Sequence, residues 1–119
     1  MDEKVKRRWI DALRSGEYKQ AQGILRNMYQ GFCCLGVLCD LHAKDTGENW
    51  HPAGPYLEYR QCKTSLPPEV FHWAGMKEST AYSTETGEGV SNKRLQNLVK
   101  MNDAGIDFTE IADYIERNL

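Results

Sequence analysis

Side chains that can grip a phosphate and stack on a base gather in the first half of the chain. Arg binds phosphate with a bidentate fork, aromatic rings stack on bases, and Ser or Gln can hydrogen-bond a ribose. The candidates for such a ligand site are Arg14, Ser15, Tyr18, Gln20, Arg26 and Trp50. Protein interfaces use the same residue types, and core packing or an ordinary surface would also explain them. The sequence leaves a ligand pocket, a protein interface and a structural role open here.

Histidine and cysteine positions give no recognisable catalytic or metal-binding pattern. The sequence contains no P-loop, dinucleotide-binding or nucleophile-elbow motif. A catalytic thiolate at Cys33 or Cys34 would need one of the isolated histidines as its base. The cysteines lack paired C-x2-C spacing, and the first ligands to consider for a metal would be Cys34, Cys39, His42 and Cys62. We expect instead reduced, buried thiols, with no metal, no cofactor and no catalytic residue.

The length, net charge and short apolar runs of the chain predict a single domain that is neither a general nucleic-acid-binding protein nor a membrane protein. The 119 residues predict a single domain, 1–119, and the net charge of −2 gives no general case for nucleic-acid binding. Residues 1–31 carry seven basic and four acidic side chains, so any attraction for an anion would be local. No apolar run approaches the roughly 20 residues of a membrane helix, and no signal-peptide core follows Met1. We expect a cytoplasmic protein with no membrane partner.

Apolar periodicity and capping signals predict five helices, which would position these residues. The amphipathic ones are expected over 2–14, over 92–103 and from Asp107 onward, where Glu110 completes a capping box. Leu35–Lys44 is apolar on most sides and predicts a buried helix, and a short helix is expected over Pro68–Ala74. The predicted core consists of Trp9, Leu13, Leu35, Leu38, Leu41, Trp73, Leu95, Leu98, Ile111 and Ile115.

Shorter segments predict a small antiparallel sheet. Gly23–Arg26 and Phe32–Cys34 could form a hairpin, and Tyr56–Lys63 reads as a strand after a loop. Residues 76–90 read as an exposed loop with an edge strand at Thr80–Tyr82. The predicted fold class is α+β, mostly helical, with a small antiparallel hairpin or sheet.

The sequence resembles a group of small phage and prophage proteins along most of its length. The segments that carry the resemblance include Ala12–Gly16, Leu25–Arg26, the distinctive run Phe32–Leu41, Trp73–Gly75 and Asn102–Gly105, with further matches at Trp9, Tyr18, Gln20, Gly23, Leu66–Pro67 and Phe108–Leu119. Residues 48–65 and 76–90 share no recognisable pattern with the group. The resemblance implies a phage origin and carries over no catalytic residue.

A phage origin implies one class of function above others. Small accessory phage proteins often act against host defence, and some sequester nucleotide immune signals such as cyclic ADP-ribose isomers or cyclic dinucleotides. We therefore expect a protein of the host cytoplasm that binds such a signal without cleaving it, as a homodimer or larger assembly. The alternatives are an adaptor or inhibitor of a host protein and, third, a nucleotide-cleaving enzyme.

Overall fold

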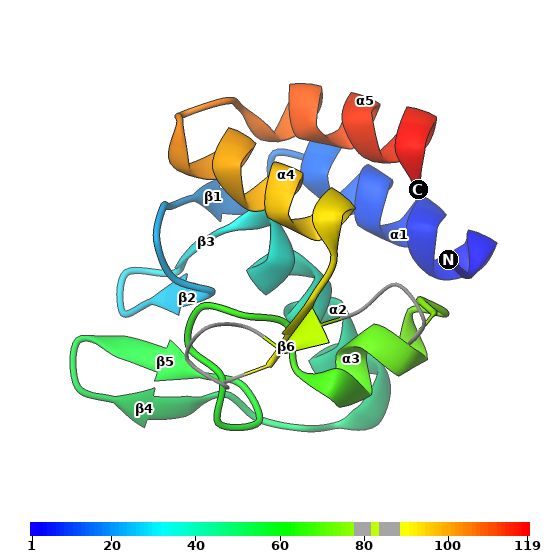
Figure 1. Cartoon of the computed structure of the whole chain (residues 1–119). Helices are drawn as coiled ribbons and strands as arrows, with labels where there is room; N and C mark the ends of the chain where they lie inside the picture. The colour runs from blue at the N-terminus through cyan, green and yellow to red at the C-terminus, as the bar shows by residue number, and fades with distance from the viewer. Residues whose placement is uncertain (78–81, 84–88) are drawn as a thin grey trace.

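A layer of three helices covers one side of the molecule, and a small sheet lies on the other (Figure 1). The computed structural model describes residues 1–77, 82–83 and 89–119. Helices α1 (Glu3–Arg14), α4 (Lys93–Asp103) and α5 (Phe108–Asn118) form the layer, with α5 packed against both others. Each begins at a polar cap: Asp2, Asn92 and Asp107 accept hydrogen bonds from backbone amides three residues on. The helices predicted from periodicity at both ends of the chain are confirmed.

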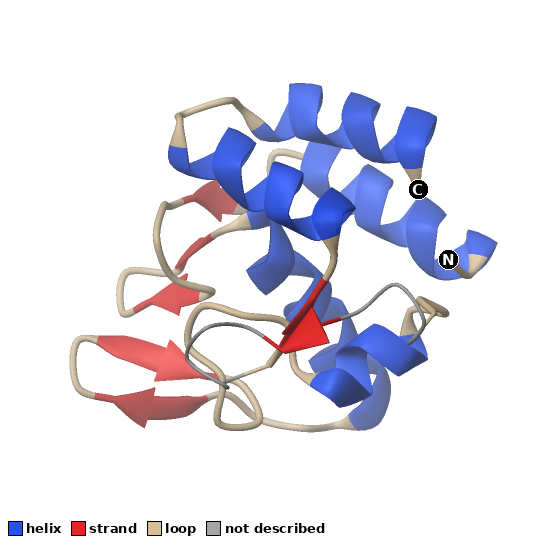
Figure 2. Cartoon of the chain, in the orientation of Figure 1, coloured by secondary structure: helices blue, strands red, loops and turns tan. Residues whose placement is uncertain are grey.

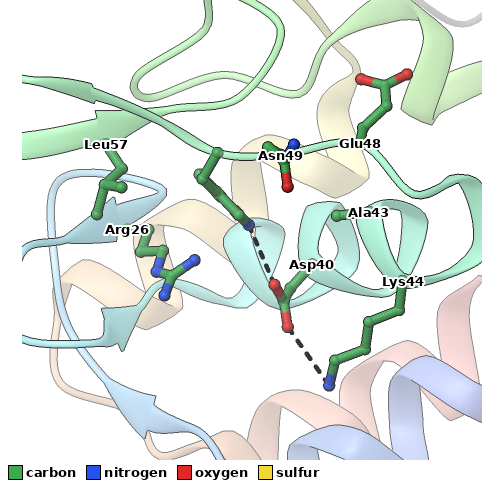
Figure 3. Close-up of a pocket in the computed structure, with 8 residues that line it drawn as sticks. Arg26, Asp40, Ala43, Lys44, Glu48, Asn49 and Leu57 are labelled. Atoms are coloured by element: carbon green, nitrogen blue, oxygen red, sulfur yellow. Dashed lines mark hydrogen bonds and ion pairs between the residues drawn. The ribbon is translucent and has the colours of Figure 1, made fainter.

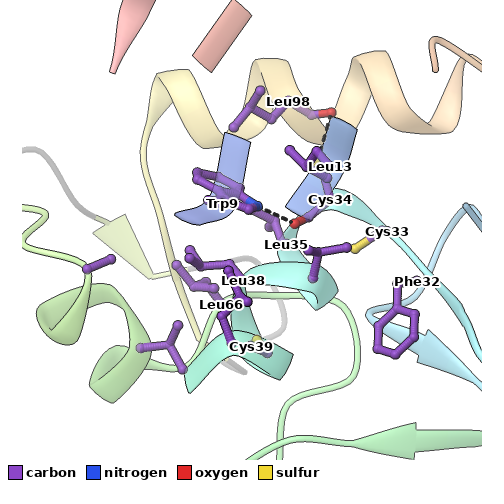
Figure 4. Close-up of a cluster of buried hydrophobic side chains, with 14 of the residues drawn as sticks. Trp9, Leu13, Phe32, Cys33, Cys34, Leu35, Leu38, Cys39, Leu66 and Leu98 are labelled. Atoms are coloured by element: carbon purple, nitrogen blue, oxygen red, sulfur yellow. Dashed lines mark hydrogen bonds between the residues drawn. The ribbon is translucent and has the colours of Figure 1, made fainter. Parts of the chain in front are cut away.

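Helix α2 (Cys34–Thr46) runs beneath this layer and contacts α1, α4 and the short helix α3 (Pro68–Trp73). It ends at Gly47, whose φ of 77° gives the left-handed conformation that glycine adopts without strain. Nearly every side of the helix is covered, so the prediction of a buried helix is confirmed. Trp9 of α1 joins α2 to the layer, because its indole Nε1 donates a buried hydrogen bond of 2.9 Å to the Cys34 carbonyl (Figure 4).

The sheet is mixed, with strand order β1-β3-β2-β5-β4 (Figure 2). Its strands are β1 (Lys19–Gln20), β2 (Arg26–Asn27), β3 (Gly31–Phe32), β4 (His51–Ala53) and β5 (Tyr56–Glu58). The β1–β3 pair is parallel and the other pairs are antiparallel. In the described residues a separate pair joins β6 (Tyr82–Ser83) to β7 (Val90–Ser91), and the short helix α3 (Pro68–Trp73) lies beside α2. The fold class is α+β, and the helices hold more residues than the strands.

Strand positions differ from the predicted ones for local backbone reasons. Gly23 has a φ of 85°, outside the extended range of a regular strand, and strand β2 begins only at Arg26. Cys33 is the N-cap of α2, not part of a strand. Strand β5 stops at Glu58 because Arg60 and Gln61 have φ values of 48° and 70° in a tight turn. Thr80 and Ala81 of the predicted edge strand lie outside the described residues.

The core agrees with the predicted list except at one position. Trp9, Leu38, Leu95, Leu98 and Ile111 are fully buried, as are most of the other predicted core residues. Trp73 is only half-buried and packs at the edge of the core, where its ring meets that of His42 edge-on, with the ring centroids 5.1 Å apart. The fold is therefore one unit built around α2, with the sheet and α3 on the side away from the helical layer.

Candidate functional site

Two adjoining hollows open where the sheet meets α2. The larger has a volume of about 360 Å³ and reaches Trp50 and Leu57. The smaller has a volume of about 200 Å³ and reaches Tyr18 and Phe32. Three charged residues line both hollows and mark the centre of the site: Arg26, Asp40 and Lys44. Figure 3 shows Arg26 and Lys44 approaching Asp40 from the sheet and from α2.

A close backbone approach positions Arg26 over α2. Gly36 lies so near the Leu25 carbonyl that a Cβ on Gly36 would be 1.8 Å from the carbonyl oxygen. The same carbonyl accepts a hydrogen bond of 3.1 Å from the Cys33 amide. Arg26 follows Leu25, and Asp40 lies one helical turn after Gly36. The absence of a side chain at Gly36 therefore brings the strand that carries Arg26 against the helix that carries Asp40.

The Arg26 guanidinium has no polar partner among the described residues. Its Nε is buried without a hydrogen bond, and no ion pair joins the group to a carboxylate within the described part of the chain. The guanidinium carbon lies 4.9 Å from the ring centroid of Phe32 and 5.4 Å from that of Trp50. These cation–π contacts hold the group at the hollow without supplying an oxygen acceptor. An anion that entered the hollow would provide one.

Asp40 is the polar centre on the helix side. It is the one residue between Cys34 and Ala43 that is not buried, and its side chain is 15% exposed at the hollow. The carboxylate accepts hydrogen bonds from the Tyr18 hydroxyl (2.7 Å) and from the Trp50 indole Nε1 (3.1 Å). An ion pair of 3.6 Å joins it to Lys44. Asp40 therefore fixes the orientation of three side chains around the hollow.

Tyr18 and Lys44 form a second contact at the edge of the site. The Lys44 ammonium donates a hydrogen bond of 3.1 Å to the Tyr18 hydroxyl, and this bond raises the pKa of Lys44. Burial and the hydrogen bond to Asp40 raise the pKa of Tyr18, so its hydroxyl stays protonated at neutral pH. Lys44 is thus shared between Asp40 and Tyr18, whereas Arg26 has no hydrogen-bond or ion-pair partner in the part of the chain that the structure describes.

Half of the ligand-binding residues predicted from the sequence come together here, and half lie elsewhere. Tyr18, Arg26 and Trp50 surround Asp40. Arg14 reaches across to α5, where it pairs with Asp113 at 2.6 Å and with Glu116 at 3.2 Å, and these partners raise its pKa. Ser15 caps the end of α1 by donating to the Ala12 carbonyl, and Gln20 donates to Asn102 and to the Ile106 carbonyl. A ligand-binding role for these residues stays a prediction.

No histidine or cysteine is among the described residues that line the two hollows. His42 is buried and shares a hydrogen bond of 2.5 Å with the Tyr59 hydroxyl, and burial lowers the pKa of His42. All four cysteines are buried and unpaired by disulfides, and burial raises the pKa of Cys33 to about 11. Figure 4 shows Cys33, Cys34 and Cys39 among apolar side chains. Over the described residues, no group of His, Cys, Asp or Glu is arranged to hold a metal ion.

Sequence reasoning missed Asp40 and Lys44. The available signal was an acidic residue inside an otherwise apolar helical run, Leu35–Leu41. A carboxylate in such a run costs free energy unless it has polar partners, so its presence indicates a polar site beside the helix. Lys44 follows four residues later, on the same face of α2.

A family model covers the whole chain, residues 1–119, and its description is "Domain of unknown function (DUF8296)". The chain belongs to this family. No curated protein and no solved structure matches the sequence. The family match extends over the full length of the chain, and it assigns neither a phage origin nor an activity. Within the described residues, no helix is both long and apolar enough to cross a membrane.

Proposed function

We propose that the chain binds a nucleotide in the two adjoining hollows that Arg26 lines, and that it holds the nucleotide without chemical change. These two hollows together form the Arg26 hollow. One observation carries the proposal: within the described residues the Arg26 guanidinium has no hydrogen-bond acceptor, and it lies against the rings of Phe32 and Trp50 at an open hollow. A charged donor left without a partner in a half-buried position is costly to the fold. A phosphate oxygen would remove that cost, which makes the phosphate group the natural first contact.

The neighbours of Arg26 suit the rest of a nucleotide. Trp50 and Tyr18 are only partly buried and offer ring surface to a base or sugar around the hollow. Asp40 accepts two hydrogen bonds and forms an ion pair with Lys44, and a carboxylate has about four lone-pair positions, so it can still accept from a ribose hydroxyl or a base amino group. A volume of about 360 Å³ lies within the range of small-ligand sites.

Binding without cleavage is favoured by what surrounds the hollow. A nucleotide-cleaving enzyme needs a general base or nucleophile within reach of the phosphate. The buried His42 makes its hydrogen bond to Tyr59, and burial keeps the Cys33 and Cys39 thiols protonated. No histidine or cysteine lines either hollow, and of the three carboxylates that do, Asp40 and Glu48 are already paired, which leaves Glu17 as the one candidate base among the described lining residues.

The biological setting we propose follows from the resemblance to phage proteins. The protein would sequester a nucleotide immune signal of the cyclic ADP-ribose or cyclic dinucleotide class in the cytoplasm of a bacterial host. A dinucleotide is larger than the hollow of one chain, so a second copy would complete the site in a homo-oligomer.

Calorimetry against cyclic dinucleotides and cyclic ADP-ribose isomers tests this proposal. Binding should weaken about 10- to 150-fold in Arg26→Ala, because a hydrogen bond to a charged group contributes about 1.5–3 kcal/mol. Arg26→Lys should also weaken it, because an ammonium lacks the planar fork. Arg94→Lys is the matched control, since Arg94 is exposed on α4 and lines neither hollow. Chromatography of the ligand recovered after heating should return it intact, and a cleaved ligand would make the protein an enzyme.

An alternative function, binding to a host protein, is favoured by one surface feature. Met28 and Tyr29 lie in the turn between β2 and β3, with exposed fractions of 60% and 80%. The Asn27 side chain accepts from the backbone amides of Tyr29 and Gly31 and so holds this turn in shape. If no nucleotide in the panel binds, Met28→Ser with Tyr29→Ser should abolish host-protein binding without loss of stability.

A further inference from the structure

The charges that line the hollow determine which charge state of a ligand phosphate can bind there. Besides Arg26 and Lys44, its lining includes three carboxylates, those of Glu17, Asp40 and Glu48. Two cations among three carboxylates leave the lining with a net charge of −1. A ligand phosphate must therefore bind next to a cation that has no carboxylate partner, and at a distance from the three carboxylates.

Two of the five charged lining residues, Arg26 and Glu17, form no ion pair with another described residue. Lys44 is taken by Asp40 and by the Tyr18 hydroxyl. Glu48 is paired with Arg60, which also contacts Glu69. Among the described residues, no ion pair reaches Arg26 or Glu17, and both line the smaller hollow.

We infer that the hollow selects a phosphate with a single negative charge, a phosphodiester, over a terminal phosphate with two. This inference rests on the proposed nucleotide binding and names the ligand class for the same site. One negative charge is matched by Arg26. A second charge on the same phosphate would face the Glu17 and Asp40 carboxylates with no free cation to offset it, because Lys44 is already engaged.

Glu17 and Asp40 are thus specificity-determining residues that act by repulsion. Such discrimination requires an unfavourable contact with the wrong ligand as well as a favourable one with the right ligand. Terminal phosphates are doubly charged above a pKa of about 6, so the hollow would bind ordinary nucleoside monophosphates more weakly near neutral pH. Cyclic nucleotides, whose phosphates are diesters, would be admitted.

Two probes with the same base and sugar test the inference: cyclic 3′,5′-AMP, a diester, and 5′-AMP, a terminal monoester. Calorimetry near pH 8 should show cyclic AMP binding about tenfold more tightly, the effect of roughly one uncompensated charge near the surface. Near pH 5.5 the 5′-AMP phosphate is mostly singly charged, and the preference should shrink to about twofold or less. Glu17→Gln should reduce the preference near pH 8, whereas Glu110→Gln on α5, away from the hollows, should not.

The possible results distinguish failure of phosphodiester selectivity from failure of nucleotide binding itself. If 5′-AMP binds as tightly as cyclic AMP near pH 8, or if Glu17→Gln leaves the preference unchanged, the inference is overturned while nucleotide binding stands. Failure of both probes to bind at millimolar concentration would overturn the inference as well. The panel of larger cyclic nucleotides then judges the proposed function on its own.

Discussion

Replacing Asn102 with Ala should destabilise the fold by about 2–6 kcal/mol, although the residue is polar and lies far from the hollow. Asn102 is fully buried in α4. Its Oδ1 accepts from the Cys34 amide at 3.2 Å and from Gln20 Nε2 at 3.0 Å, and its Nδ2 donates to the Ala21 carbonyl at 2.7 Å. Gln20 keeps its second hydrogen bond, to the Ile106 carbonyl. The substitution therefore leaves two groups without the partner that Asn102 supplied, the Cys34 amide and the Ala21 carbonyl. Each such group costs about 1–3 kcal/mol, which gives the stated range.

Urea denaturation followed by circular dichroism measures this loss, provided that the transition is two-state. Asn118→Ala is the matched control, because Asn118 is exposed and, among the described residues, its side chain donates to the Tyr114 carbonyl of its own helix alone. The control should change the unfolding free energy by no more than about 0.5 kcal/mol. If Asn102→Ala is as stable as Asn118→Ala, the hydrogen bonds of Asn102 do not join α4 to the β1 segment and to α2, and the reasoning is wrong.

Three further perturbations test how the site is held. Gly36→Ala would place a Cβ 1.8 Å from the Leu25 carbonyl oxygen, so urea unfolding should show a loss of at least about 1–3 kcal/mol. Burial lowers the pKa of His42 below its unfolded value of about 6.5, so the unfolded chain binds more protons and stability falls as pH drops below that value. Denaturation near pH 7.5 and near pH 5.5 should show a smaller fall in His42→Gln; an equal fall would contradict this. Because burial raises the pKa of Cys33 to about 11, and those of Cys34 and Cys39 as well, a thiol reagent should label these residues only on unfolding, and rapid native labelling would refute their burial.

The helices could be predicted because their signals are local. Asp107 with Glu110 marked the start of α5, and the spacing of Val5, Trp9 and Leu13 marked the buried face of α1. Helix α2 was predicted as buried because its apolar residues surround the whole helix. Such features depend on neighbours within a few residues, which the sequence places directly.

The strands could not be placed, because long-range contacts decide them. Strand β1 consists of two polar residues, and it pairs in parallel with β3 although β2 lies between them in the chain, so no hairpin turn marks the pairing. Arg60 and Gln61 adopt positive φ values although neither is a glycine, so the end of β5 carries no sequence signal. These strands are fixed by the packing of the sheet on α2.

Only part of the candidate site could be predicted, because contacts between residues distant in the sequence also decide which side chains are free to bind a ligand. Residue type identified Tyr18, Arg26 and Trp50, which meet in space. Residue type also selected Arg14, whose partners on α5 are 99 and 102 positions away in the sequence. Whether an Arg is free for a ligand depends on such distant carboxylates. Arg14 and Arg26 therefore look alike in the sequence and differ in the fold.

Nuclear magnetic resonance of the arginine side chains tests the central claim most directly, since it observes the Arg26 Nε–H itself. Burial of this group slows its exchange with water, and loss of the signal in Arg26→Lys identifies it. Addition of the tightest-binding nucleotide in the panel should shift the Arg26 signal and leave those of Arg14 and Arg94 in place. A nucleotide that binds while the Arg26 signal stays unchanged would contradict the account and place the ligand elsewhere.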